Sequence, residues 1–319
     1  MQDMLIHFGI QLAILTVGFV LLIKGADFFV KGASTIARRF GVPQIVIGLT
    51  VVAMGTSAPE AAVSISAAMS GNADITIGNV IGSNIMNILV ILGITSLVAP
   101  LPVDRSAAKV DIPFNFGITL LLLPLGLLGA SVNRWEGVLL LAVFTAYMVY
   151  LFRQAMKNRD TKEEIRPTYG QGNLWTIIFV TLLGLAMIVA GSKFTVHAAT
   201  EMALALGVSQ RMIGLTVVAF GTSLPELVTS VTAARRGNTG IAIGNIVGSN
   251  IFNILFVTGL TAVITPIAFI KAFLLDTGVA AFAVLILWIF AAKKGILGRL
   301  SGVIMIVCYA AYFAYVIAF

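Results

Sequence analysis

Ten stretches of predominantly apolar residues follow one another along the chain, separated by short polar segments. Each is about 20 residues or longer, the length that crosses the hydrocarbon core of a bilayer as an α-helix. The stretches lie near residues 6–34, 42–70, 75–98, 110–131, 135–155, 173–202, 208–234, 241–264, 270–292 and 298–318. The continuous apolar run at 116–130 lacks the polar/apolar alternation of an outer-membrane β-barrel strand. The pattern therefore predicts an all-α integral membrane protein with ten transmembrane helices.

The composition supports this fold class and excludes several functions. The 319 residues are 59% hydrophobic and only 10% charged, whereas soluble domains carry about 25% charged residues. So little charge does not cover a water-exposed surface, which excludes a cytosolic enzyme, a nucleic-acid-binding protein and a disordered scaffold. The single cysteine, Cys308, provides neither a disulfide framework nor a cysteine metal site. The first ten residues lack a basic segment and a cleavage site, so we expect no cleavable signal peptide.

The positions of Lys and Arg predict the orientation, because short cytoplasmic loops are enriched in both. With both termini outside, the outside loops hold only Arg134, Arg211 and Lys271. The inside loops hold Arg38, Arg39, Arg105, Lys109, Arg153, Lys157, Arg159, Lys162, Arg166, Arg235, Arg236, Lys293, Lys294 and Arg299. The sequence pI of about 9.7 thus reflects topology. We expect a multi-pass protein of a prokaryotic cell (inner) membrane, with both termini extracellular or periplasmic.

The sequence repeats itself after 166 residues. VPQIVIGLTVVAMGTSAPE at 42–60 matches VSQRMIGLTVVAFGTSLPE at 208–226, and GNADITIGNVIGSNIMNIL at 71–89 matches GNTGIAIGNIVGSNIFNIL at 237–255. Shared hydrophobicity does not explain this, because Thr, Ser, Asn, Pro and Glu match too. Each copy has five spans, an odd number, so the second copy is inverted relative to the first. We predict a five-helix repeat at 1–155, a cytoplasmic linker loop at 156–172 and a second, inverted five-helix repeat at 173–319.

Each copy contains a motif that combines a helix breaker with a carboxylate: GTSAPE at 55–60 and GTSLPE at 221–226. Proline removes one helical N–H and clashes with the carbonyl of the preceding turn. The freed carbonyls are tolerated in a membrane only where they are buried or line a polar cavity. Glu60 and Glu226 add one carboxylate from each copy at the same depth. Inverted repeats are typical of secondary transporters, whose binding site lies near mid-membrane.

A second motif supplies neutral oxygens in the following span of each copy. Ser83 and Asn87 are four residues apart and share a helical face, as do Ser249 and Asn253. Oxygen-rich clusters of this kind suit hard cations such as calcium, and the lack of His and Cys argues against zinc or copper. Taken singly, a Gly–Pro kink or a Ser/Asn face serves helix packing. Their duplication in opposite orientations favours an ion site.

These motifs resemble the two alpha repeats of the sodium/calcium exchangers in the calcium/cation antiporter superfamily, and the resemblance covers nearly the whole chain. It implies ion binding between the spans at 42–70, 75–98, 208–234 and 241–264. It also implies alternating access, in which the spans at 6–34 and 173–202 slide across the site. The implied function is a secondary antiporter that exchanges sodium for calcium, and not an enzyme.

The resemblance assigns roles by motif position. Glu60 and Glu226 would bind calcium, together with the backbone carbonyls of Thr56 and Thr222. The flanking sodium sites would be formed by Ser57, Ser223, Ser83 and Ser249 with the carbonyls of Ala53 and Ala219, and Asn87 and Asn253 would border the centre. The expected partners are calcium and sodium ions and the lipid bilayer, with no cofactor and no nucleic acid. We expect the chain to function as a monomer.

Asn253 departs from the family pattern, because several members carry aspartate at this position. The site therefore has two carboxylates instead of three. One calcium ion balances two carboxylates, whereas three sodium ions leave one positive charge. The sodium count and a potassium dependence stay open. So does a proton-coupled exchanger, in which Glu60 and Glu226 would carry the protons.

Two other classes of function fit less well. An ion channel usually assembles one axial pore from several subunits, whereas this chain contains a complete two-fold set of polar residues. An intramembrane hydrolase using Ser57 or Ser223 lacks a nearby histidine to act as a base. Outside the motifs, Asp27 and Lys193 occupy matching positions with opposite charge. We expect each to pair with a neighbour or reach the membrane interface, and a gating role is the alternative.

Overall fold

The computed structural model describes residues 2–70, 74–129, 131–158, 173–207, 219–269 and 272–318, which are mostly helical. The first half contains α1 (Gln2–Phe40), α2 (Gln44–Ile47), η1 (Gly48–Val52), α3 (Ala53–Thr56), α4 (Ala58–Met69), α5 (Asp74–Met86), η2 (Asn87–Leu92), α6 (Gly93–Val98), β1 (Leu101–Pro102), η3 (Ala107–Asp111), α7 (Ile112–Gly129), β2 (Ser131–Val132) and α8 (Arg134–Asn158). The second half contains α9 (Leu174–Ala205), α11 (Ala219–Thr222), α12 (Leu224–Arg235), α13 (Thr239–Phe252), η5 (Asn253–Val257), α14 (Thr258–Ile264), β3 (Ile267–Ala268), α15 (Ala272–Lys294), β4 (Ile296–Leu297) and α16 (Arg299–Ala318). The letter η marks π-helical segments.

Within the described ranges, eight helical segments are long and apolar enough to cross a membrane. The broken helix Gln44–Thr56 plus Ala58–Met69, bent by 49°, makes a ninth candidate. The remaining predicted span, 208–234, falls partly outside the described residues, which resume at Ala219. The helices agree with the expected spans within a few residues, and α1 extends the most beyond its prediction.

The two spans that carry the Ser/Asn motifs form the centre of the molecule. In the spans Thr76–Val98 and Thr239–Ile264, 78% and 83% of the most apolar stretch is buried, against 17–39% in the other six spans. The broken helices pack against them: η1 and α3 contact α13, and α12 contacts η2. Polar residues carried by these two spans are therefore enclosed by protein.

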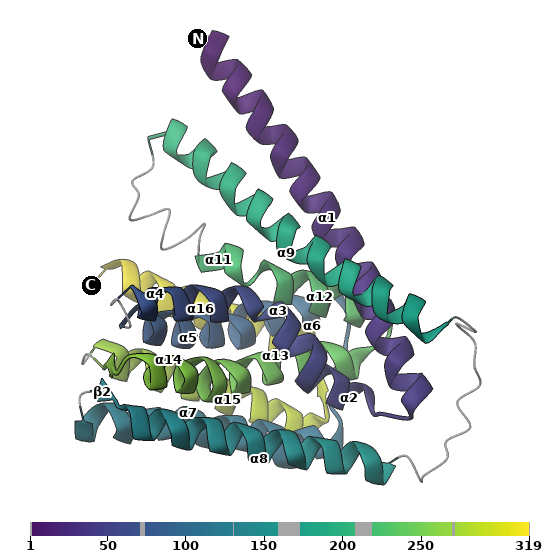
Figure 1. Ribbon diagram of the computed structural model, residues 1–319, viewed down its shortest axis with the longest axis vertical. Coiled ribbons are helices and arrows are strands. Elements are labelled where there is room, and N and C mark those ends of the chain that lie inside the picture. The colour runs from purple at the N-terminus through teal and green to yellow at the C-terminus, as the bar shows by residue number, and fades with distance from the viewer. Residues whose placement is uncertain are drawn as a thin grey trace.

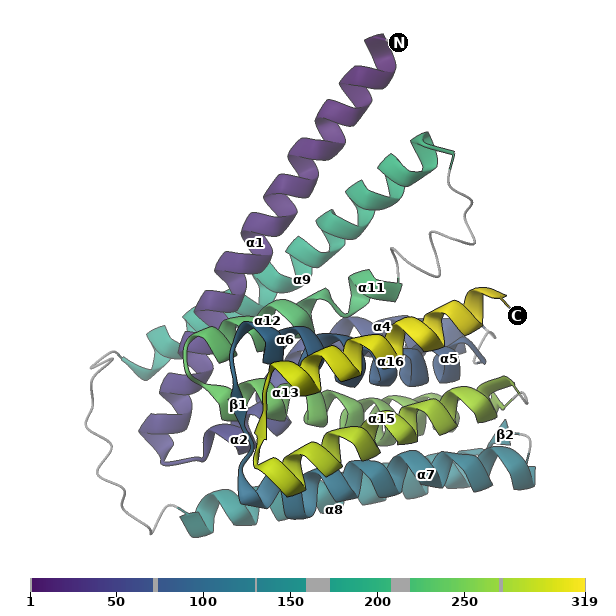
Figure 2. The same ribbon diagram turned by 180° about the vertical axis from the view of Figure 1, so that it is seen from behind.

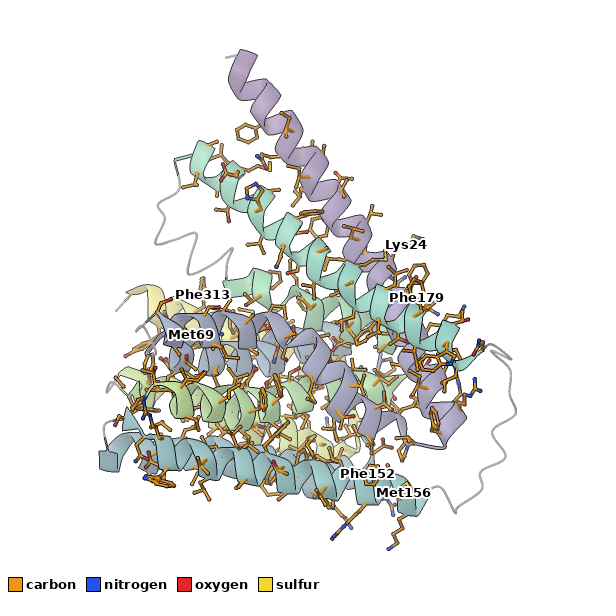
Figure 3. The ribbon with its side chains drawn as sticks, viewed as in Figure 1. Lys24, Met69, Phe152, Met156, Phe179 and Phe313 are labelled. Atoms are coloured by element: carbon orange, nitrogen blue, oxygen red, sulfur yellow. The ribbon has the colours of Figure 1, made fainter. Side chains whose placement is uncertain are left out.

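The outer helices present apolar side chains outward. Phe152 and Met156 on α8 and Phe179 on α9 are exposed and project from the surface in Figure 3. Because large exposed apolar areas are rare on soluble monomers, this surface fits contact with lipid. The structure thus agrees with a membrane protein of several apolar helices.

Two short antiparallel ladders, which the hydrophobic pattern does not predict, tie the two halves together. Leu101 pairs with Leu297 in the β1–β4 ladder, and Val132 pairs with Ile267 in the β2–β3 ladder. Figure 2 shows β1 beside the C-terminal helices. Each ladder joins a segment of the first half to one of the second, so the halves are interleaved.

The two long helices α1 and α9 lie side by side and lean away from the remaining helices (Figure 1). Their backbones come close at two glycine pairs. A Cβ atom at Gly25 would lie 2.8 Å from the Gly184 carbonyl oxygen, and one at Gly18 would lie 3.0 Å from the Gly191 carbonyl oxygen. Small residues allow membrane helices to pack at van der Waals distance. Close backbone approach at these glycines therefore joins α1 to α9 over a long contact.

One ion pair connects α1 to α12. Arg236 donates to Asp27 Oδ1 from Nη2 at 2.8 Å and from Nε at 3.0 Å. The prediction that Asp27 pairs with a neighbour is confirmed, whereas Lys193 at the matching position on α9 is exposed. Asp27 and Arg236 are each roughly two-fifths exposed, and such ion pairs contribute about 0–1 kcal/mol to stability.

We expect Gly184→Val to weaken the α1–α9 contact. The added Cβ would lie 2.5 Å from the Phe29 backbone nitrogen and 2.7 Å from the Gly25 carbonyl oxygen, and overpacking of this kind costs about 1–3 kcal/mol. Thermal unfolding of the purified protein in detergent measures the loss. Gly117→Val is the control, because a Cβ there meets nothing within 4 Å. Equal stabilities of the two variants would contradict the close approach.

Candidate functional site

Each carboxylate-bearing motif breaks its helix at the serine. Ser57, with φ −84° and ψ 7°, separates α3 from α4, and Ser223, with φ −89° and ψ 2°, separates α11 from α12. Proline occupies the first turn of α4 and of α12, where its missing N–H costs no hydrogen bond. Glu60 and Glu226 lie in these same first turns. The positive end of each short helix therefore lies near a carboxylate and favours its charge.

Both carboxylates are buried without a basic partner. Glu60 is 2% exposed and Glu226 is 1% exposed, and among the described residues neither forms an ion pair. Ser57 Oγ donates to Glu226 Oε1 at 2.8 Å, from the first half to the second. The Oε2 atom of each glutamate has no hydrogen-bond partner in the described part of the chain. Two buried, acceptor-only oxygens therefore remain available to a cation.

One asparagine supports each carboxylate from the neighbouring helix. Asn79 Nδ2 donates to the Glu60 carbonyl oxygen at 3.3 Å, and Asn245 Nδ2 donates to the Glu226 carbonyl oxygen at 3.4 Å. Each amide also donates to a serine hydroxyl at 3.0 Å, Ser64 in the first half and Ser230 in the second. These bonds hold the turn that carries the carboxylate against α5 or α13.

A second set of asparagines joins α5 to α13. Asn84 and Asn250 each donate to the other's backbone carbonyl oxygen, at 3.2 and 3.3 Å. Asn87 Nδ2 donates to Asn250 Oδ1 at 3.0 Å, and Asn253 Nδ2 donates to Asn84 Oδ1 at 3.2 Å. The amide donors are thus used between the helices. The Oδ1 atoms of Asn87 and Asn253 have no hydrogen-bond partner among the described residues and remain acceptors.

The other predicted ligands lie on the same elements. Ser249 is fully buried on α13, and its Oγ lies 3.5 Å from the Ala53 carbonyl oxygen on α3. Ser83 is buried on α5, and Thr56 donates to Asn245 Oδ1 at 2.9 Å. Thr222 ends α11, and Ala219 begins α11, with its side chain outside the described set. The structure brings α3, α4, α5, α12 and α13 together, with their polar residues turned inward.

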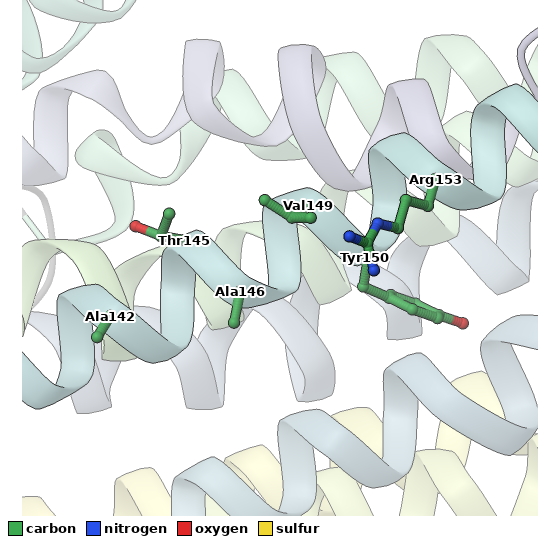
Figure 4. A pocket seen from close by; sticks show the side chains of 6 residues that line it. All are labelled: Ala142, Thr145, Ala146, Val149, Tyr150 and Arg153. Carbon is green, nitrogen blue, oxygen red and sulfur yellow. The ribbon is translucent and has the colours of Figure 1, made fainter.

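One groove on the molecule lies away from these helices. A groove of about 610 Å³ runs along α8 past Ala146, Val149, Tyr150 and Arg153 (Figure 4). It contains neither glutamate. The carboxylates are enclosed between packed helices, as expected for an ion held inside a membrane protein and not for a large ligand.

Comparison with known proteins identifies the family. The family model described as "Sodium/calcium exchanger protein" matches residues 10–153 and 176–318, which is most of the chain. The chain belongs to the sodium/calcium exchanger family. It is 40% identical to the "Putative antiporter CaxA" of Alkalimonas amylolytica, over 93% of this chain and 95% of that protein.

Two further relatives extend this comparison. The "Sodium/calcium exchanger MaX1" of Methanosarcina acetivorans is 35% identical, over 95% of this chain and 97% of that protein. A solved structure of the sodium-calcium exchanger NCX_Mj superposes with a TM-score of 0.83 at 32% identity, covering 96% of this chain and 98% of that one. The exchangers are transporters, and membership supports cation/calcium antiport.

Several residues of the site were not assigned a role from the sequence: Asn79, Asn245, Ser64, Ser230, Asn84 and Asn250. The signal was present, because all six are identical between the two copies of the repeat. Their hydrogen bonds between helices, in which the asparagine amides donate and the Ser64 and Ser230 hydroxyls accept, depend on which faces meet, and the motif spacing does not show this.

We expect Asn245→Ala to destabilise the protein strongly. The substitution removes one acceptor and two donors from a fully buried position, and each net hydrogen bond contributes about 1 kcal/mol, with more where a buried partner is left unpaired. A loss of about 3 kcal/mol should lower the thermal unfolding temperature in detergent. Asn79→Ala is the matched comparison at a half-buried position and should cost less. A larger loss of thermal stability in Asn79→Ala than in Asn245→Ala would refute this prediction.

Proposed function

We propose that the chain exchanges sodium for calcium across the cell membrane by alternating access. The observation that carries this proposal is the pair of buried carboxylates, Glu60 and Glu226, each with one oxygen that has no hydrogen-bond partner among the described residues. A buried charge is stable only when it is paired or coordinates a metal. Calcium takes six to eight oxygen ligands, including carboxylates and carbonyls. Two carboxylates neutralise one calcium ion.

The ligand assignment follows from the same oxygens. Glu60 and Glu226 bind calcium with the carbonyls of Thr56 and Thr222. Sodium occupies the flanking positions, which are formed by Ser57, Ser223, Ser83 and Ser249 and the carbonyls of Ala53 and Ala219. Asn87 and Asn253 border the centre with their amide oxygens. The separation of only 3.5 Å between Ser249 Oγ and the Ala53 carbonyl oxygen supports a shared site.

The proposed architecture is ten transmembrane helices in two inverted five-helix repeats, residues 1–155 and 173–319, joined by the cytoplasmic loop 156–172. Reciprocal contacts support it. Asn84 and Asn250, which are 166 positions apart, exchange equivalent hydrogen bonds, and the two strand ladders are equivalent in the same sense. In this arrangement both termini lie outside, and α1 and α9 slide across the site. One chain contains the complete site and works as a monomer.

We expect Glu60→Gln and Glu226→Gln each to abolish calcium uptake driven by an outward sodium gradient in proteoliposomes. Each variant replaces a charged ligand by a neutral one, and bonds to charged groups are worth about 1.5–3 kcal/mol, so calcium affinity should fall at least about tenfold. Glu136→Gln is the control, because its carboxylate accepts from the Asn133 backbone at the surface. Calcium uptake at the wild-type rate in both site variants would refute the assignment.

The presence of asparagine at position 253 motivates the second candidate, a proton- or potassium-coupled exchanger. A site with two carboxylates instead of three has less negative charge, and this charge determines less strictly which ion is exchanged for calcium. Calcium flux measured with sodium, potassium and pH gradients imposed one at a time separates the candidates. We expect the sodium gradient alone to drive uptake, and uptake with only a pH or potassium gradient would favour the alternative.

A further inference from the structure

Another buried carboxylate, Asp111, lies away from the central site, immediately before α7. Asp111 is 1% exposed and ends the π-helical segment η3. Its Oδ1 accepts a hydrogen bond from Tyr147 Oη on α8 at 2.9 Å, and the Tyr147 ring stacks on Phe114 with centroids 4.6 Å apart. Its Oδ2 has no hydrogen-bond partner, and no basic side chain pairs with it, in the described part of the chain. Asp111 is therefore a buried charge with one unsatisfied oxygen.

The next helical turn carries another unsatisfied group. Asn115 is fully buried, and neither its Oδ1 nor its Nδ2 has a hydrogen-bond partner among the described residues. Because Asp111 and Asn115 are four residues apart, their side chains lie on one face of α7. Leaving buried polar atoms unpaired costs about 1–3 kcal/mol for each group. Such a cluster within an otherwise apolar helix points to a bound ligand.

The backbone at this position resembles that of the central site. Among the described residues, η1 immediately precedes Ala53, η2 begins at Asn87 and η5 begins at Asn253. These three π-helical segments therefore adjoin residues assigned to ion binding. The fourth, η3, ends at Asp111. A π-turn shifts carbonyls out of the regular helical pattern and is frequent at functional sites.

The second half of the chain offers an internal comparison. Asp276 accepts from Tyr312 Oη at 2.8 Å, which repeats the Asp111–Tyr147 pair with the same spacing of 36 residues. However, Asp276 is only partly buried. Asp276 lies 165 positions after Asp111, and the residue 165 positions after Asn115 is Ala280. At this position α15 is a regular α-helix without a π-helical segment. The shared pair is thus a packing feature, and the additional groups are specific to the first half.

We propose that Asp111 Oδ2, Asn115 Oδ1 and carbonyls of η3 other than those of Ala107 and Ala108, which already accept hydrogen bonds, bind a single sodium ion. All of these ligands are hard oxygens, which suit alkali and alkaline-earth cations. One carboxylate balances one positive charge, whereas a calcium ion would leave an uncompensated charge in a low-dielectric setting. A proton on Asp111 would let Oδ2 donate to Asn115 Oδ1 but would still leave Asn115 Nδ2 without an acceptor. A sodium ion with one attached water satisfies all three atoms, because the water accepts from Nδ2.

This site is independent of the proposed exchange reaction, and its test uses a background without the central carboxylates. Equilibrium binding of radioactive sodium is measured on the purified full chain carrying Glu60→Gln and Glu226→Gln. Asp111→Asn or Asn115→Leu, added to this background, should weaken the remaining sodium binding at least about tenfold. Asp276→Asn, which alters the equivalent Asp–Tyr pair, should leave it unchanged.

Asp111→Asn preserves the size of the side chain and the acceptor for Tyr147, and Asn115→Leu provides a second variant that keeps Asp111. Thermal unfolding with and without sodium checks that each variant folds. Sodium should raise the unfolding temperature of the background protein and of Asp276→Asn. It should not raise the unfolding temperature of Asp111→Asn or Asn115→Leu. Unchanged sodium binding in both Asp111→Asn and Asn115→Leu, or equal losses in Asp276→Asn, would overturn the proposal.

Discussion

The hydrocarbon core of a bilayer has no water to solvate charge, and Glu60 and Glu226 lie buried in the first turns of the short helices α4 and α12, with no basic partner among the described residues. Much of the surrounding structure follows from this constraint. The breaks at Ser57 and Ser223 place a helix N-terminus beside each carboxylate, which lowers the cost of its charge. The Oε2 atom of each carboxylate has no hydrogen-bond partner among the described residues and stays available to a cation, whose binding completes the charge balance.

The asparagines meet a second requirement, which is to hold the site rigid without consuming its acceptors. The amide donors of Asn84, Asn87, Asn250 and Asn253 all go to oxygens on the facing helix. A lysine or arginine would also hold the helices, but its positive charge would compete with the cation for Glu60 and Glu226. Neutral donors avoid this competition. Because the bonds run between α5 and α13, the two halves of the chain fix one site jointly.

The fold could be predicted from the sequence where a single physical rule governs it. Helix lengths follow from bilayer thickness, and the two copies of the motif identified Glu60, Glu226 and their serine neighbours. Features that depend on which faces meet were not predicted: the π-helical segments, the two-residue strands, and Asn79 and Asn245 as supports. The Asp111–Tyr147 and Asp276–Tyr312 pairs were not predicted for another reason. The two pairs are 165 residues apart in the sequence, whereas the motifs align at a shift of 166 residues.

The energetics divide the molecule into a rigid part and a part that can shift. Around α5 and α13, buried hydrogen bonds are numerous, and breaking one leaves a polar group unpaired at about 1–3 kcal/mol. Among the described residues, the polar link between α1 and α12 is one half-exposed ion pair worth about 0–1 kcal/mol. Glycine pairs bring the backbones of α1 and α9 into close contact, and one buried hydrogen bond, from Ser192 Oγ to the Gly221 carbonyl oxygen at 2.8 Å, joins α9 to the motif that carries Glu226. In the proposed transport cycle, α1 and α9 therefore move as one unit over a fixed ion site, because among the described residues this motion breaks fewer buried hydrogen bonds than separating α5 from α13 would.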